Sequence, residues 1–162
     1  MKQLVLALGA DSAGTQLKNL LRDRLKADGR VELRDYGDCG DEVAYPHIGL
    51  AVAEMVARGE ADRAILICGT GIGMAIAANK VPGIRATVAH DSYSVERSIL
   101  SNDCQVLTMG ARVIGPELAS RLAHEWIGYV FDAASPSARK VQVITDYEQS
   151  RALNHLAADS TS

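Results

Sequence analysis

Aromatic residues, cysteines and an excess of either charge are all scarce in this sequence. Phe, Trp and Tyr make up 4% of the 162 residues, which leaves few side chains on which nucleic-acid bases could stack. The net charge of −3 argues against a protein that binds nucleic acid through its overall field. Three cysteines without paired spacing, Cys39, Cys68 and Cys104, provide neither a disulfide framework nor a four-ligand zinc site. We therefore expect no nucleic-acid partner and no bound metal.

Long hydrophobic runs are also missing. The first apolar run, LVLAL at 4–8, stops before Gly9 and is too short for a secretory signal or a membrane span. Hydrophobic residues make up 48% and charged residues 23%, as in globular proteins rather than disordered ones. We expect a cytoplasmic protein without a membrane partner, in which residues 1–156 form one domain and 157–162 a disordered tail.

Short β-rich runs alternate with longer stretches of helical period. Three of the five short runs are almost continuously apolar, which indicates strands covered on both faces of a sheet. The alternation predicts an α/β fold with a five-stranded parallel sheet and helices on both of its faces. The expected strands are 3–8, 31–36, 63–68, 85–89 and 105–109, and the expected helices between and after them are 15–27, 48–58, 73–79, 92–100 and 116–129.

Residues 135–156 predict one further helix, which is largely charged. Its apolar residues form a modest stripe, made of Val141, Ile144, Tyr147 and Leu153. This stripe fits two arrangements, packing on the protein's own sheet or contact with a partner subunit.

The segment CGTGIGM at 68–74 is the most informative feature for function. A strand runs directly into three alternating glycines, Gly69, Gly71 and Gly73, and then into a helix. Glycines let an anion approach the backbone amides closely, and the start of a helix adds unpaired N–H groups. A thiolate at Cys68 would be stabilised beside these amides. Taken alone, the segment also fits a buried cysteine before an ordinary turn.

A nucleotide-binding loop is another interpretation of the same glycines. A P-loop needs GxxxxGK followed by Ser or Thr, whereas Lys80 follows Asn79 and precedes Val81. A dinucleotide fingerprint needs GxGxxG, whereas the spacing here is GxGxG. Asp91 does lie about twenty residues further on, where such sites place an acidic residue.

Other polar residues stand near the ends of expected strands, where open parallel sheets bind ligands. Asp11 either caps the following helix or grips substrate hydroxyls. Tyr45 precedes Pro46, which can open a helix, and its ring can also wall a pocket. His90 fits a satisfied structural histidine better than a catalytic one.

For the basic residues and the other two thiols, the sequence also fits either a structural or a functional role. Arg112 is either a surface charge or an anion clamp, and Arg139 and Lys140 at the start of the last helix raise the same alternatives. Cys39 and Cys104 are expected to be incidental thiols.

Six segments of the chain match one enzyme family in the same order: GADSAG (9–14), AYPH (44–47), residues 62–86, HDSYS (90–94), SND (101–103) and GARVIG (110–115). On these segments the chain resembles the type B ribose-5-phosphate isomerase and galactose-6-phosphate isomerase family. The resemblance implies a single-domain, Rossmann-like fold with three α/β/α layers. It also implies a homodimer or tetramer in which subunits share active sites, and chemistry without a metal or organic cofactor.

The resemblance further implies a small-molecule sugar phosphate as substrate, and interconversion of its aldose and ketose forms through a cis-enediolate. Cys68 matches the base of this reaction, and Thr70 matches a hydroxyl that orients the substrate or shuttles protons. The developing oxyanion would sit against amides of the 71–74 stretch. Positions assigned to substrate binding are Asp11, Ser12, Tyr45, Gly69, Gly71, Gly73, Met74, Ser101, Asn102, Arg112, Arg139 and Lys140.

Three positions depart from the family members that act on ribose 5-phosphate. Ser12 replaces one histidine, and Ser101 replaces the histidine assigned to sugar-ring opening. A pair of phosphate-gripping arginines becomes SPSARK at 135–140, with Arg139 or Lys140 as substitutes. The loss of two histidines also fits a non-catalytic sugar-phosphate sensor, although the intact cysteine and threonine of the glycine-rich segment argue against it.

The missing ring-opening residue has a chemical interpretation. A pentose 5-phosphate is largely a furanose, whereas a tetrose 4-phosphate cannot close that ring because its O4 is esterified. Ser101 cannot act as an acid–base near neutral pH as imidazole can, and an acyclic substrate would not require it. Serine at both positions also resembles the erythrulose-4-phosphate isomerase branch. We therefore favour erythrulose 4-phosphate and erythrose 4-phosphate, with ribose 5-phosphate and ribulose 5-phosphate as the alternative.

Overall fold

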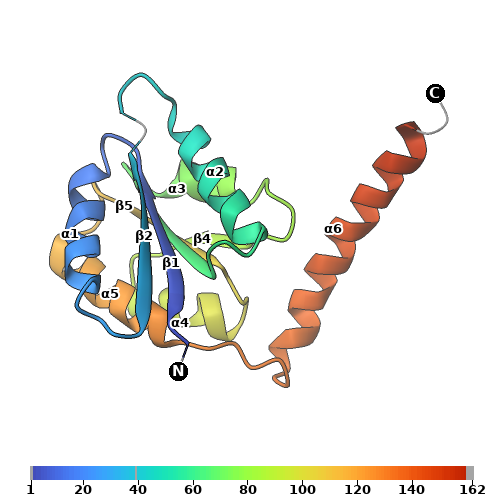
Figure 1. Cartoon of the computed structure of the whole chain (residues 1–162). Coiled ribbons are helices and arrows are strands. Elements are labelled where there is room, and N and C mark those ends of the chain that lie inside the picture. Colours follow the sequence, from blue (N-terminus) through green and yellow to red (C-terminus); the bar gives the residue numbers. More distant parts are fainter. Residues whose placement is uncertain (1, 39, 160–162) are drawn as a thin grey trace.

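A computed structural model describes residues 2–38 and 40–159 of the chain. Its centre is a sheet of five parallel strands in the order β2-β1-β3-β5-β4 (Figure 1). The strands are β1 (Leu4–Ala10), β2 (Val31–Asp38), β3 (Arg63–Cys68), β4 (Ala86–Val88) and β5 (Val106–Gly110). The helices are α1 (Thr15–Leu25), α2 (Tyr45–Ala57), α3 (Ile72–Ala78), α4 (Ser92–Leu100), α5 (Pro116–Gly128) and α6 (Ser137–Asp159). The expected α/β fold is confirmed.

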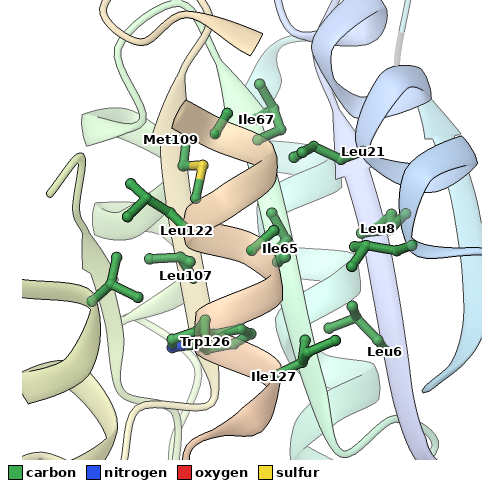
Figure 2. Packing of buried hydrophobic residues seen from close by; sticks show 14 of the residues in the cluster. Leu6, Leu8, Leu21, Ile65, Ile67, Leu107, Met109, Leu122, Trp126 and Ile127 are labelled. Atoms are coloured by element: carbon green, nitrogen blue, oxygen red, sulfur yellow. The ribbon is translucent and has the colours of Figure 1, made fainter. Parts of the chain in front are cut away.

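Helices cover both faces of this sheet. Helices α1, α4 and α5 enclose one cluster of buried apolar side chains, which includes Ile65 of β3 and Trp126 of α5 (Figure 2). The indole N–H of Trp126 donates to the hydroxyl of Ser98 on α4 at 3.1 Å, which links two of these helices. Helices α2 and α3 enclose a second cluster on the other face, around Leu66 and Met74. The chain therefore has the three α/β/α layers that the resemblance implied.

The burial pattern of the strands follows their apolar content. β3, with the sequence RAILIC, is buried from Ala64 onward and lies at the centre of the sheet. β2 carries charged residues along VELRDYGD, and it forms an edge where most of its side chains meet solvent. Strands that are apolar on both faces thus occupy the positions that helices cover from both sides.

The neighbouring strands β1 and β3 send their following helices to opposite faces of the sheet. Helix α1 joins the layer of α4 and α5, whereas α3 joins the layer of α2. Where two adjacent connections diverge in this way, a crevice opens at the carboxyl ends of the strands, and open α/β sheets bind their ligands there. The topology therefore directs attention to the loops after β1 and β3.

Helix α6 stands away from the sheet (Figure 1). Val141 near its start is buried, whereas Ile144, Tyr147 and Leu153 are 52%, 68% and 67% exposed. The N–H of Gly83 in the α3–β4 loop donates to Glu148 of this helix at 2.7 Å. The interpretation that α6 packs on its own sheet is wrong, because most of its apolar stripe extends past the domain. Contact of the stripe with a partner subunit stays a prediction.

Element boundaries agree with the sequence pattern to within a few residues. Helix α2 starts at Tyr45, earlier than expected, because Pro46 fits the first turn of a helix. Of the tail expected at 157–162, residues 157–159 continue α6, and residues 160–162 lie outside the described residues, as does Cys39. Within the described part of the chain, no helix is both long and apolar enough to cross a membrane.

Candidate active site

A cavity of about 230 Å³ opens at the carboxyl ends of β1 and β3, where the two connections diverge. The N–H of Asp11, just after β1, donates to the carbonyl of Ile67 in β3 at 3.1 Å, which holds the two strand ends together. The cavity is lined by Asp11, Tyr45, Cys68, Gly69, Thr70, Gly73 and Arg112. The fold thus brings together seven of the residues that the sequence analysis selected.

Cys68 is the last residue of β3 and lines this cavity. The residue is 5% exposed to solvent. The backbone N–H of Gly71 points back at the sulfur and donates to Sγ at 3.1 Å. A hydrogen bond strengthens when its acceptor is charged, so this N–H stabilises a thiolate more than a thiol. The sulfur thus lies at the cavity wall with a backbone donor directed at it.

Glycine at position 71 is required by the shape of the loop. Gly71 has φ 79° and caps α3, a left-handed conformation that side chains disfavour. A Cβ there would lie 2.9 Å from Val88 and from the backbone of Met109. The turn sends the next amide, that of Ile72, to the hydroxyl of Thr70 at 3.2 Å.

One more amide at the start of α3 remains available for a ligand. The first turn of a helix leaves N–H groups without intrahelical acceptors. Within the described part of the chain, the N–H groups of Gly73 and Met74 have no protein acceptor. Met74 is 0% exposed as a whole residue and does not line the cavity, whereas Gly73 does. The N–H of Gly73 can therefore receive an oxyanion that develops beside Cys68.

The remaining walls of the cavity supply a carboxylate, a phenol and a guanidinium. Asp11 does not cap α1, because Gly14 holds the N-cap position and has no side-chain cap hydrogen bond. The Oδ1 of Asp11 accepts the N–H of Gly14 at 2.9 Å, and the residue lines the cavity, where contact with substrate hydroxyls stays a prediction. The ring of Tyr45 lies against Gly73, and the guanidinium of Arg112 lies over Gly69. A Cβ at Gly73 would collide with the Tyr45 ring, so Tyr45 could not keep its place there, whereas a Cβ at Gly69 would lie 3.1 Å from the Arg112 guanidinium and only tighten that contact.

Seven predicted site residues do not line this cavity within one chain: Gly71 and Met74, which lie behind it in the same loop, and five residues elsewhere. Ser12 is exposed on the loop after β1 and is not among the lining residues. Ser101 and Asn102 follow α4 and precede β5, so they lie at the amino edge of the sheet, opposite Cys68. Arg139 and Lys140 are exposed in the first turn of α6. A single subunit therefore holds only part of the predicted constellation.

The loop that carries Asn102 is nevertheless firmly placed. The guanidinium of Arg85 donates to the carbonyl of Asn102 at 2.9 Å and to that of Asp103 at 2.8 Å. Asp103 adopts φ 46°, a left-handed turn that directs the chain into β5. A separate cavity of about 410 Å³ lies beside this loop and is lined partly by Arg85, Arg97 and Asn102, but it does not include Cys68.

Comparisons with known proteins agree with this geometry. A model of the family described as Ribose/Galactose Isomerase matches residues 6–144. The chain belongs to the ribose/galactose isomerase family. It is 57% identical over 148 residues to D-erythrulose-4-phosphate isomerase 2 of Mycolicibacterium smegmatis, covering 90% of this chain and 97% of the relative. It is 48% identical over 145 residues to Ribose-5-P isomerase B of Listeria innocua, covering 89% and 97%. The structure of Clostridium thermocellum ribose-5-phosphate isomerase B matches with a TM-score of 0.85 at 43% identity, covering 91% and 99%.

The nucleotide-binding interpretation finds no support in this member of the ribose/galactose isomerase family. Asp91, the candidate for a ribose contact, caps α4 instead, since its Oδ1 accepts the N–H of Ser94 at 2.7 Å. The residues described in the structure contain no group of three or more His, Cys, Asp or Glu side chains that could hold a metal ion.

His90, just after β4, has a structural partner next to the site. Its Nε2 accepts the N–H of Gly110 at 2.8 Å, a role that requires the neutral ring. Gly110 in turn packs so closely on the backbone of Thr70 that a Cβ would lie 2.5 Å away. Burial lowers the pKa of His90 from its ordinary value of 6.5, partly opposed by the charge of Asp91. The expectation of a satisfied structural histidine fits this geometry.

This histidine predicts a pH dependence of stability. Because the folded state lowers the pKa of His90, the unfolded chain binds the proton first as the pH falls. The contribution of His90 is complete above its unfolded pKa and is lost as the pH falls through its lower folded pKa, so the free energy of unfolding should fall as the pH drops below about 6.5. His90→Gln can still accept the Gly110 N–H but does not titrate, and it should flatten this slope.

Urea unfolding at several pH values measures the slope. His47→Gln is the matched control, because His47 is exposed and the change should leave the slope as it is. An unchanged slope in His90→Gln would contradict the assignment.

The backbone donors just after β5 were not predictable from the sequence. The N–H of Ala111 donates to the carbonyl of Cys68 at 2.8 Å, and that of Arg112 donates to the carbonyl of Gly69 at 3.0 Å. These bonds join residues more than forty positions apart, and backbone groups carry no residue-specific signal. Only the parallel pairing of β3 with β5 brings them into register.

Proposed function

We propose that this member of the ribose/galactose isomerase family interconverts an aldose phosphate and a ketose phosphate, with Cys68 as the base. One observation carries the proposal: the Cys68 sulfur faces a polar cavity and accepts the N–H of Gly71 at 3.1 Å. A base that moves protons between carbons needs access to the substrate and a stabilised anionic form. Cys68 has both.

The reaction proceeds as two proton transfers on one face of the sugar. The Cys68 thiolate removes a proton from the carbon next to the carbonyl, and the electron pair forms a cis-enediolate. The negative charge on oxygen is stabilised by the free amide of Gly73 at the cavity wall. Thr70, whose hydroxyl lines the cavity, moves the proton between the two substrate oxygens. The Cys68 thiol then returns its proton to the neighbouring carbon, which completes the isomerisation without a net change in redox state.

The phosphate group requires positive charge at the far end of the cavity. Arg112 supplies a guanidinium at the cavity wall. Arg139 and Lys140 lie on α6, so in this proposal they reach a cavity only from a second copy of the chain, as Ser101 and Asn102 do. The exposed apolar residues of α6 support such a homodimer, since a partner would cover them.

We infer that erythrulose 4-phosphate and erythrose 4-phosphate are the preferred substrates. Ser12 and Ser101 leave the site without the imidazoles that would open a furanose ring. The relative from Mycolicibacterium smegmatis, at 57% identity, is named for erythrulose 4-phosphate. Ribose 5-phosphate and ribulose 5-phosphate are the alternative, because ribose-5-phosphate isomerases B also match most of the chain.

Deuterium exchange tests the proposal against a non-catalytic sugar-phosphate sensor. With erythrulose 4-phosphate in D2O, the protein should introduce deuterium at the carbon beside the carbonyl while erythrose 4-phosphate forms, both visible by proton NMR. Binding without exchange, with either the tetrose or the pentose phosphate, would identify a sensor instead.

A further inference from the structure

Thr108 is a polar residue in the middle of a buried apolar strand. It lies on β5 within VLTMG and is 0% exposed. Its hydroxyl donates to the carbonyl of Gly71 at 2.7 Å, while the carbonyl of Thr87 lies further away at 3.4 Å. A buried hydroxyl needs a partner, and the shorter distance identifies Gly71 as its acceptor.

Both backbone groups of Gly71, its N–H and its carbonyl, are therefore hydrogen-bonded. Its N–H donates to the Cys68 sulfur, and its carbonyl accepts from the Thr108 hydroxyl and from the N–H of Ala75 at 3.1 Å. The bond to Ala75 belongs to α3 and moves with that helix. The bond to Thr108 instead fixes the glycine to the central sheet, which also carries Cys68. The direction of the N–H at the sulfur therefore depends on where Thr108 holds the residue.

Other bonds between β5 and this loop come from the backbone and do not depend on side-chain identity. They include the bonds from Ala111 to Cys68 and from Arg112 to Gly69. Among the hydrogen bonds described between β5 and the Gly-rich loop, only that of Thr108 comes from a side chain. A substitution at Thr108 can therefore change the geometry at Gly71 while these backbone hydrogen bonds stay in place.

We propose that Thr108 is a positioning residue for Cys68, whose hydroxyl orients Gly71 so that its N–H stabilises the thiolate. The inference rests on the proposed role of Cys68 as base. Without the hydroxyl, the Gly71 carbonyl keeps only its helical donor, and the left-handed turn loses its anchor to the sheet. The N–H then points less directly at the sulfur, and it stabilises negative charge on that sulfur less.

Two readouts test the role of Thr108. Thr108→Val keeps the shape of threonine but removes the donor, and it should slow alkylation of Cys68 by iodoacetamide at neutral pH roughly 5- to 30-fold, because the Gly71 N–H bond to the thiolate is weakened and not lost. Mass spectrometry of the Cys68 peptide reports this rate separately from the other thiols. The value of kcat should fall by a similar factor while KM changes little, because substrate contacts are untouched.

Thr108→Ser should restore both rates, since serine retains the hydroxyl. If Thr108→Val does not fold, Thr108→Cys replaces it, because cysteine has nearly the volume of serine but donates only weakly. Ile127→Val, a core change on the opposite face of the sheet, controls for a general loss of stability. The inference would be overturned if the variant without the hydroxyl kept the wild-type alkylation rate and kcat. It would also be overturned if Thr108→Ser lost as much of both rates as that variant.

The outcomes also separate this inference from the proposed function. If Cys68 is not the base, Cys68→Ala retains turnover whatever happens at Thr108. If Cys68 is the base but Thr108 does not position it, Cys68→Ala is inactive while Thr108→Val keeps the wild-type alkylation rate.

Discussion

Replacing Cys68 with alanine should lower kcat for the sugar phosphate by about 10²–10⁴-fold, the usual contribution of a general base. The change removes one sulfur atom at the cavity wall, and the N–H of Gly71 loses its acceptor. The donors of Gly73 and Arg112 at the cavity wall remain, so substrate should still bind. Steady-state kinetics and calorimetric titration with the sugar phosphate measure the two effects separately.

Cys104→Ala provides the matched control for this experiment. Cys104 is also a buried thiol, but burial raises its pKa to about 11, so it remains protonated at neutral pH. It lies just before β5 and does not line the cavity of Cys68. Its variant should keep the wild-type kcat. Full activity in Cys68→Ala, or equal losses in both variants, would refute Cys68 as the base.

Much of the fold was predictable because it depends on local composition. The run RAILIC predicts a strand covered on both faces, and β3 indeed lies at the centre of the sheet. The position of the cavity was also predictable, since polar loops after parallel strands meet at one edge. Asp11 is far from Cys68 and Thr70 in the chain, yet the pairing of β1 with β3 brings all three to one cavity.

What the sequence could not predict depends on contacts between distant residues. Nothing in QVLTM distinguishes a threonine that bonds Gly71 from one that only fills space. His90 likewise acquires its role from Gly110, twenty residues away. Helix α6 shows a different limit: its apolar stripe is visible in the sequence, but whether a helix packs on its own sheet depends on the length and path of the preceding loop.

The choice between tetrose and pentose substrates yields the second large effect. Ring opening matters for the aldose, so the test compares kcat/KM for erythrose 4-phosphate and ribose 5-phosphate on the same enzyme. The tetrose cannot form the furanose, so it needs no ring opening. The pentose ring must be opened, and Ser101 cannot provide acid–base catalysis for that step. We expect the tetrose to be preferred by about 10²–10⁴-fold, the typical value of such catalysis. A preference for the pentose would contradict this expectation.

Ser101→His should then raise activity toward ribose 5-phosphate while leaving the tetrose rate nearly unchanged. In the wild-type chain the guanidinium of Arg97 lies 3.4 Å from the Ser101 hydroxyl. A neighbouring positive charge favours a neutral imidazole, the form that can accept the proton of the ring hydroxyl. Ser101→Asn is the control, because it adds a larger side chain that does not titrate. It separates the effect of proton transfer from the effect of side-chain size. A gain in pentose activity with histidine but not with asparagine would show that proton transfer at this position, rather than pocket size, sets the substrate preference.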